Sequence, residues 1–212
     1  MVRQQSGFTL VEMAVVLVII GLLLGGVLKG QELINSAKAK SLVNDFRATA
    51  TFLYGYQDRF RALPGDDAAA DTHIGGVKAT TGGTLGNGRI EGAWDSTTET
   101  DESVLFWQHV RLANLTSGTT TAPTAATILA WLPRNAEGGR IGITSTVPIT
   151  GLTGSFFVCQ GSLSGRFARQ IDTTMDYGIS NTGTVQLTTE ATKPTASATV
   201  TDTGTYTVCV AY

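Results

Sequence analysis

The sequence predicts an α+β fold in which one long N-terminal helix packs on an antiparallel β-sheet. Three observations carry this prediction. No charged side chain occurs from Met13 to Leu28, and apolar residues then recur at helical spacing as far as Leu63. The second half of the chain is rich in threonine and glycine and poor in charge, which is typical of strands and loops rather than helices. Helix therefore precedes sheet along the chain.

The apolar segment is long enough to cross a membrane. Residues 8–28 contain one charge, that of Glu12, and about 20 helical residues span a hydrocarbon core of about 30 Å. A buried core helix is one alternative, but soluble helices are seldom apolar on every face over this length. A cleaved secretory signal is another, but no A-x-A cleavage site follows the apolar run. We expect a retained membrane-spanning helix.

The helix is expected to continue past the membrane as an amphipathic segment, residues 29–63. Apolar side chains recur there at intervals of three and four. They are Val43, Phe46, Ala50, Leu53 and Phe60. The segment should end at Leu63, because Pro64-Gly65 cannot continue a helix and Asp66-Asp67 favour a turn.

Residues 64–212 are expected to form a globular head. Short helices are predicted at 101–115, with Asp101 as the N-cap, and at 167–175. Residues 65–99 are predicted to be a loop, either a surface or subunit-contact segment or a poorly ordered one. A second loop is predicted at 116–127.

Strands are predicted in the rest of the head from alternating or β-branched runs. They cover 141–149, 155–160, 184–189 and 203–212. The last run places Tyr206, Val208, Val210 and Tyr212 on one face.

The residues around Glu12 resemble the prepilin signal of type IV pilins and type II secretion pseudopilins. The similarity rests on the heptapeptide SGFTLVE, residues 6–12, followed by the apolar run. It implies a leader of residues 1–7, cleavage between Gly7 and Phe8 by a prepilin peptidase, and N-methylation of Phe8. Many family members carry proline where this chain has Lys29. Glycines 21, 25 and 26 would then supply either helix flexibility or close packing between helices.

The resemblance also implies a role for Glu12 in assembly. A carboxylate in an apolar span is costly, so it should have a cationic partner. The resemblance supplies one, the α-amino group of Phe8 in a neighbouring subunit. We expect no compensation within the same chain, because an amine at a helix start points away from the following turn.

The resemblance further implies a structural function. The chain would be a subunit of a type IV pilus-like filament, assembled with homologous subunits on an inner-membrane platform that a separate ATPase drives. The filament would belong either to a type II secretion system or to a surface type IV pilus for adhesion, motility or DNA uptake. The subunit would wait in the inner membrane, in contact with lipid, with a periplasmic head. It would end in a periplasmic or cell-surface filament.

Composition and motifs argue against other functions. A net charge of −2 leaves no basic excess for bulk binding of nucleic acid. The chain contains no G-x-x-x-x-G-K-[ST] loop for ATP and no G-x-S-x-G nucleophile elbow. We therefore expect no enzyme and no cofactor; a membrane-anchored enzyme or sensor is the alternative.

The two cysteines, Cys159 and Cys209, are too few for a four-ligand zinc site. In the oxidising periplasm that the resemblance implies, we expect them to form one disulfide. On the chain-entropy model a closed loop of about 50 residues contributes about 4 kcal/mol. The alternative is two separate buried thiols.

The glycine-rich loop near Asn87 is expected to be a solvated turn without a metal. The alternative is a calcium site formed by Asn87, Glu91 and Asp95, since oxygen ligands in a flexible loop suit Ca²⁺. Pseudopilins, which the chain resembles, include calcium-binding members. Arg89, however, would place a cation among these ligands.

Overall fold

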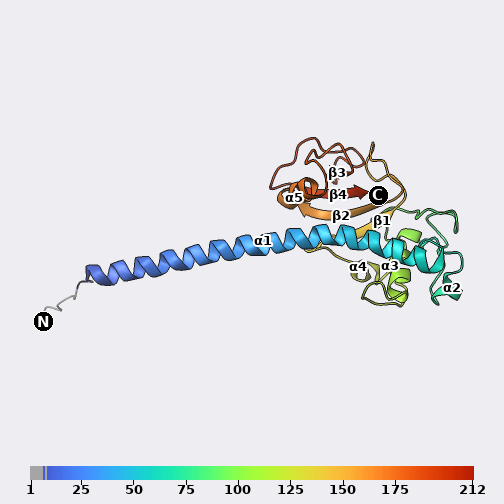
Figure 1. The fold of residues 1–212 in the computed structure, drawn as a ribbon, viewed down its shortest axis with the longest axis horizontal. Coiled ribbons are helices and arrows are strands. Elements are labelled where there is room, and N and C mark those ends of the chain that lie inside the picture. The colour runs from blue at the N-terminus through green and yellow to red at the C-terminus, as the bar shows by residue number, and fades with distance from the viewer. Residues whose placement is uncertain (1–6, 8) are drawn as a thin grey trace. The chain divides into compact units, whose positions relative to one another are not determined.

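The computed structural model describes Gly7 and residues 9–212. Figure 1 shows the order of the elements along the chain. The helices are α1 (Leu10–Phe60), α2 (Ala70–His73), α3 (Glu102–Leu112), α4 (Ile128–Trp131) and α5 (Gly165–Met175). The strands are β1 (Ile141–Thr144), β2 (Phe157–Ser164), β3 (Val185–Thr188) and β4 (Thr205–Ala211). The α+β prediction is confirmed.

The chain divides into two compact units, one ending at Lys38 and the other running from Ala39 to Tyr212. We call the second unit the head. The boundary falls inside α1, so the last 22 residues of the helix are part of the head's own core.

The head is built around a four-stranded antiparallel sheet with the strand order β1-β2-β4-β3. The central pair is β2 and β4, in which Cys159 lies directly opposite Cys209. The register of this pair shifts between Gln160 and Leu163, which marks a β-bulge.

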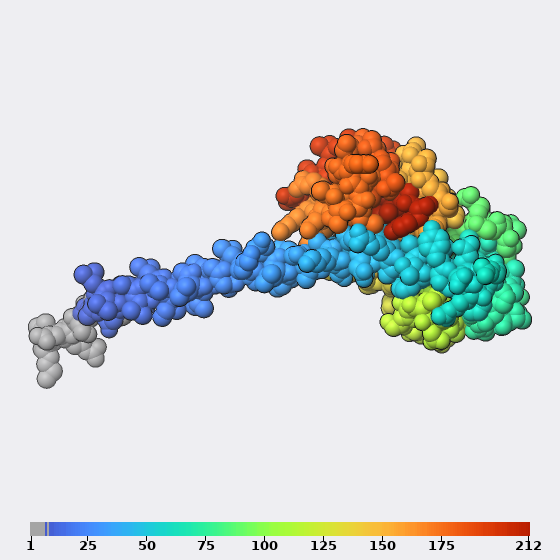
Figure 2. All heavy atoms as spheres, viewed as in Figure 1, coloured from blue at the N-terminus to red at the C-terminus, as the bar shows by residue number. Residues whose placement is uncertain are grey.

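The second half of α1 buries one stripe of side chains in the head. The stripe contains Ala39, Leu42, Val43, Phe46, Thr49, Ala50, Leu53 and Tyr56. This part of the helix lies between the sheet with α5 on one side and α3 with α4 on the other (Figures 1 and 2). One polar contact fixes it to the sheet: the side-chain amide of Gln160 donates to the carbonyl of Leu42 at 2.9 Å.

Both faces of β4 are buried, and alternation assigns its side chains to two clusters. Tyr206, Val208 and Val210 belong to the large core that also contains the α1 stripe. The intervening Cys209 and Ala211 belong to a second cluster, together with Cys159, Phe157, Ile149 and Leu152. Loops, rather than a second sheet, therefore cover the outer face.

Loop segments also occupy the edges of the sheet. At the β3 edge, the Leu187 amide donates to the Ser180 carbonyl at 2.9 Å, and the Leu187 carbonyl accepts from Ser197 at 2.7 Å. At the β1 edge, Ile141 donates to Pro133 at 3.1 Å.

Several predicted boundaries were wrong, two of them for clear local reasons, and the predicted N-cap residue of α3 makes no cap bond. Helix α1 ends at Phe60 rather than at Leu63, because Arg61 has a left-handed φ of 56°. Strand β1 ends at Thr144, because the Ser145 amide turns away to the carbonyl of Ile90. The side chain of Asp101 precedes α3 but makes no capping hydrogen bond; it accepts instead from Thr81 and Ser96, each at 2.6 Å.

The predicted loop 65–99 is anchored by a buried carboxylate. Asp66 accepts hydrogen bonds from the backbone amides of Gly86, Asn87 and Gly88, the last at 2.7 Å. Ile90, near the end of this loop, is fully buried. The loop is thus a fixed part of the head rather than a poorly ordered segment.

Candidate functional site

The first part of α1 presents apolar side chains on every face. Every large apolar residue from Leu10 to Leu28 is exposed, as are Leu33 and Ile34. Among the described residues, α1 is the one helix that is long and apolar enough to span a membrane, and none of that apolar window is buried in the chain itself. Such a surface requires lipid or other apolar helices around it.

Thr9 and Glu12 form a capping box at the start of this helix. The Thr9 amide donates to Oε2 of Glu12 at 2.8 Å, and the Thr9 hydroxyl donates to the same oxygen at 2.9 Å. In return, the Glu12 amide lies 3.2 Å from the Thr9 hydroxyl oxygen. Amides that the helix leaves unpaired at its first turn are satisfied in this way.

This geometry corrects one expectation. We expected the chain itself to offer Glu12 no compensation, yet Thr9 supplies two donors. Both act on Oε2, and Oε1 has no hydrogen-bond partner among the described residues. The sequence carried the signal, since T-x-x-E before an apolar run is a helix-start signature.

The predicted processing site lies partly outside the described residues. Gly7 is exposed and precedes the helix, and a methyl group added to it would meet no atom within 4 Å. Phe8, with its expected cleavage, methylation and pairing to Glu12, lies outside the described residues, as do residues 1–6 of the expected leader. Cleavage, methylation and pairing therefore stay predictions.

Glycines in the membrane segment do not interrupt α1. The helix is continuous through Gly21, Gly25 and Gly26, and an added Cβ at any of them would meet no atom within 4 Å. Gly21 and Gly25 are four residues apart and so lie on one helix face, which lets a second helix approach closely.

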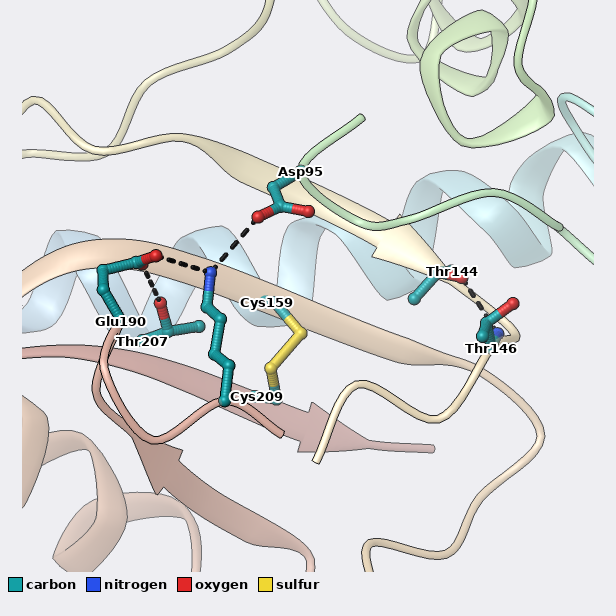
Figure 3. The surroundings of a disulfide bond; sticks show 8 residues. Asp95, Thr144, Thr146, Cys159, Glu190, Thr207 and Cys209 are labelled. Atoms are coloured by element: carbon teal, nitrogen blue, oxygen red, sulfur yellow. Dashed lines mark hydrogen bonds and ion pairs between the residues drawn. A yellow bond between two sulfur atoms is a disulfide. The ribbon is translucent and has the colours of Figure 1, made fainter. Parts of the chain in front are cut away.

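The disulfide prediction is confirmed. Cys159 and Cys209 are bonded, with 4.1 Å between their Cα atoms, and both are fully buried (Figure 3). The bond joins the two central strands, where the residues already oppose each other. The cross-link therefore closes a segment of 50 residues without changing the register of the sheet.

The three residues considered for calcium do not converge on one point. The Asn87 amide donates to Glu91 at 2.7 Å, so its nitrogen rather than its oxygen faces that carboxylate. Asp95 instead forms an ion pair with Lys193 at 3.2 Å. Within the part of the chain that the structure describes, no group of three or more His, Cys, Asp or Glu side chains could hold a metal ion.

Glu102 and Asp172 are buried carboxyl groups in the head, and each has one oxygen without a hydrogen-bond partner among the described residues. Glu102, in the first turn of α3, is fully buried, and its Oε2 accepts from the Glu91 amide at 2.7 Å. Its Oε1 has no partner among the described residues. Burial raises the pKa of Glu102 to about 7, and the nearby Asp66 and Glu91 charges add to the effect.

Comparison with known proteins gives one match. Residues 2–28 match the family model of the prokaryotic N-terminal methylation motif. No curated protein and no solved structure matches the chain significantly. The matched segment contains Gly7, Phe8, Thr9 and Glu12, and it ends where the apolar run ends.

Proposed function

We propose that this chain, which carries the prepilin-type N-terminal methylation motif of the type IV pilin and pseudopilin superfamily, is processed and assembled as a subunit of a type IV pilus-like filament. A prepilin peptidase would remove residues 1–7 between Gly7 and Phe8, and Phe8 would be N-methylated. Residues 8–28 would be the membrane and assembly helix, residues 29–63 its amphipathic continuation, and residues 64–212 the head proper. The role is structural rather than enzymatic.

The observation that carries the proposal is the match over residues 2–28, on the part of α1 whose large apolar side chains, from Leu10 to Leu28, are all exposed. In the membrane, lipid covers this surface. After processing, the same surface can pack against identical helices of neighbouring subunits. A head-to-tail arrangement of this kind does not close on itself and so generates a helical filament.

Glu12 would provide the charge pairing within the filament. Thr9 holds Oε2, which leaves Oε1 for the α-amino group of Phe8 in the next subunit. An ammonium buried in an apolar bundle without a counter-charge would be strongly unfavourable. Correctly staggered subunits would therefore be preferred over other packings.

The buried disulfide supports a periplasmic position for the head, since such bonds form in oxidising compartments. The subunit would then wait in the inner membrane and leave it on assembly. We propose a secretion pseudopilus or a surface pilus as the destination. Deletion of the gene separates the two: loss of protein secretion indicates the former, and loss of surface fibres indicates the latter.

Processing is the direct test. Mass spectrometry of the protein from its native cells should show an N-terminus at Phe8 that carries one extra methyl group. An intact Met1, or a cut after residue 28, would contradict the proposal, because neither fits a prepilin. A Gly7→Leu variant should accumulate as the uncleaved precursor.

A further inference from the structure

A pocket of about 300 Å³ opens on the head beside the bulge in β2. Its lining contains the charged, polar and aromatic side chains of Trp94, Asp95, Arg134, Arg140, Ser162 and Glu190. The proposed assembly function uses none of them. Pockets that hold small ligands begin at about this size, so the space suits a ligand of roughly one ring.

Two arginines line this pocket from paired backbone positions. Arg134 and Arg140 form an isolated antiparallel bridge, so their side chains leave the backbone on the same side, about 5 Å apart at Cβ. Like charges that lie directly opposite each other are unfavourable unless something neutralises them. Within the described part of the chain, no carboxylate forms an ion pair with either arginine.

The guanidinium of Arg134 is held in place by carbonyl groups. It donates to Gly138 at 2.7 Å and to Leu129 at 3.1 Å. Arg140 reaches the Ser96 carbonyl at 3.4 Å. These contacts orient the two groups without neutralising them, and each keeps further N–H donors, because a guanidinium carries five.

The acidic groups of the pocket are already engaged. Asp95 and Glu190 both pair with Lys193, at 3.2 Å and 3.0 Å. Figure 3 shows the Asp95 and Glu190 carboxylates reaching the same lysine ammonium, that of Lys193, above the disulfide. Glu137, in the turn between the arginines, accepts from Ser164 at 3.3 Å. One end of the pocket is thus cationic, and the other offers carboxylate oxygens that can still accept hydrogen bonds.

Ser162 contributes a free hydroxyl from a constrained backbone. It has a φ of 57°, it is exposed, and its side chain has no hydrogen-bond partner among the described residues. A non-glycine residue in this region of φ is uncommon. Its position in the bulge turns the side chain toward the pocket that it lines.

We propose that this pocket binds an acidic sugar, that is, one saccharide ring that carries a carboxylate. The carboxylate would lie between Arg134 and Arg140, whose planar donors match its two oxygens. The ring hydroxyls would donate to Asp95 and Glu190 and pair with Ser162. The exposed side chain of Leu129 lines the same pocket and offers apolar contact to the ring. The indole of Trp94 also lines it, and the Lys193 ammonium lies 5.1 Å from the centroid of that indole ring.

All residues of the pocket belong to one chain, so ligand binding does not require an assembled filament. Its outward position in an assembled filament does rest on the proposed function, since the α1 helices would then form the interior. The binding test uses the unassembled chain, so failure of the pocket and failure of filament assembly give separate results.

The experiment is isothermal titration of the full chain in an uncharged detergent with three probes: glucuronic acid, glucose and inorganic phosphate. We expect saturable binding of glucuronic acid, with glucose and phosphate each binding at least about tenfold more weakly. Glucose lacks the carboxylate that the arginines would bind, and phosphate lacks the ring hydroxyls that the carboxylates and Ser162 would bind. Arg134→Gln and Arg140→Gln should each weaken glucuronic acid binding about tenfold or more. Ser162→Gly should weaken it less.

Arg166→Gln is the matched control, since Arg166 is an exposed arginine on α5 that does not line the pocket. Tryptophan fluorescence should show that all variants remain folded. Absence of saturable binding overturns the proposal. Equal affinity for glucose or for phosphate overturns it as well, as does an Arg166→Gln effect as large as that of Arg134→Gln.

Discussion

The hydroxyl of Tyr56, near the end of α1, donates a hydrogen bond of 2.7 Å to Asp67 in the loop that follows the helix. The same carboxylate oxygen lies 2.7 Å from Nδ1 of His73, and its other oxygen accepts from the Ala69 amide at 2.8 Å. Asp67 is almost fully buried. The end of the helix and the start of the loop are therefore joined through one carboxylate.

Tyr56→Phe should lower the free energy of unfolding by about 1–3 kcal/mol, because it removes one donor from a buried carboxylate. Urea unfolding followed by tryptophan fluorescence would measure the loss, since Trp94, Trp107 and Trp131 all lie in the head. Tyr54→Phe is the control, as Tyr54 is 53% exposed and its hydroxyl has no hydrogen-bond partner among the described residues. Equal losses in both variants would refute a specific role for the Tyr56–Asp67 bond.

The same variant should change the response to acid. Burial raises the pKa of Asp67, but hydrogen bonds from His73 and Tyr56 outweigh burial and hold the pKa below its usual value. A depressed carboxyl pKa contributes stability that is present above the unfolded pKa and lost as pH falls through the folded one. Without the Tyr56 hydroxyl, acid unfolding should begin at a higher pH than in the wild-type chain.

Glu102→Gln should stabilise the head at alkaline pH. The pKa of Glu102 is raised from 4.5 to about 7, so the folded state binds a proton that the unfolded state has released. Stability of the wild-type chain should therefore fall as pH rises from about 4.5 to about 7, by at most about 3 kcal/mol. The variant lacks this titration, so the difference in the free energy of unfolding between the variant and the wild-type chain should be smallest below about pH 4.5 and largest near pH 8.

Unfolding in urea at each pH would measure this difference. Glu99→Gln, three residues earlier in the chain, controls for the loss of one carboxylate. If the free energy of unfolding changes with pH in the same way in Glu102→Gln and in the wild-type chain, the Glu102 carboxyl is not protonated in the folded state at neutral pH.

Removal of the disulfide by the double substitution Cys159→Ala and Cys209→Ala should lower the free energy of unfolding by about 3–4 kcal/mol. The bond closes a segment of 50 residues in the centre of the sheet, so its loss enlarges the unfolded ensemble. Chemical reduction of the wild-type chain should produce a loss of similar size. Free thiols detected by alkylation of periplasmic material would show that the bond is absent in the cell.

Glu12→Gln should block assembly without blocking membrane insertion. A neutral amide is easier to insert than a carboxylate, and the Gly7–Phe8 junction is unchanged. The incoming amine, however, would lose its counter-charge. Processed monomer in the membrane and sheared filament from the same cells should be measured together, and normal filament yield would refute charge pairing.

Thr9→Val provides a comparison for that experiment. It removes the hydroxyl that donates to Glu12 but keeps the Thr9 amide and the Glu12 charge. Filament yield should therefore fall less than in Glu12→Gln. A Thr9→Val variant as defective as Glu12→Gln would indicate that the capping geometry, rather than the charge, controls assembly.

The sequence predicted the elements that have strong patterns. Uniform apolarity and a three-to-four repeat located α1 to within three residues at its C-terminal end, and alternation located β4. Helices α2 and α4 were missed because each has only four residues, too few to show a period. The two central strands, β2 and β4, were each predicted from their own local pattern. That they pair, and in which register, could not be predicted, because strand pairing depends on residues far apart in the sequence.

The candidate site was predictable only in part. The motif identifies Gly7, Phe8 and Glu12, whereas the capping bond from Thr9 follows from a different signal, the T-x-x-E spacing of residues 9–12, which does not depend on the charge of Glu12. The pocket lined by Arg134 and Arg140 could not have been predicted. Its members come from α4, β2 and three loops, and only folding brings Trp94 and Ser162 to the same place.

The bonded edges of the sheet have a consequence for how two heads can meet. An open strand edge is a template for pairing with another chain and leads to aggregation. At β3 both outward amides, those of Val185 and Leu187, are already bonded, and at β1 Ile141 is bonded to Pro133. A second head that approaches either edge therefore finds these three strand amides already paired. Pairing of two sheets edge to edge into one continuous sheet is disfavoured at these positions.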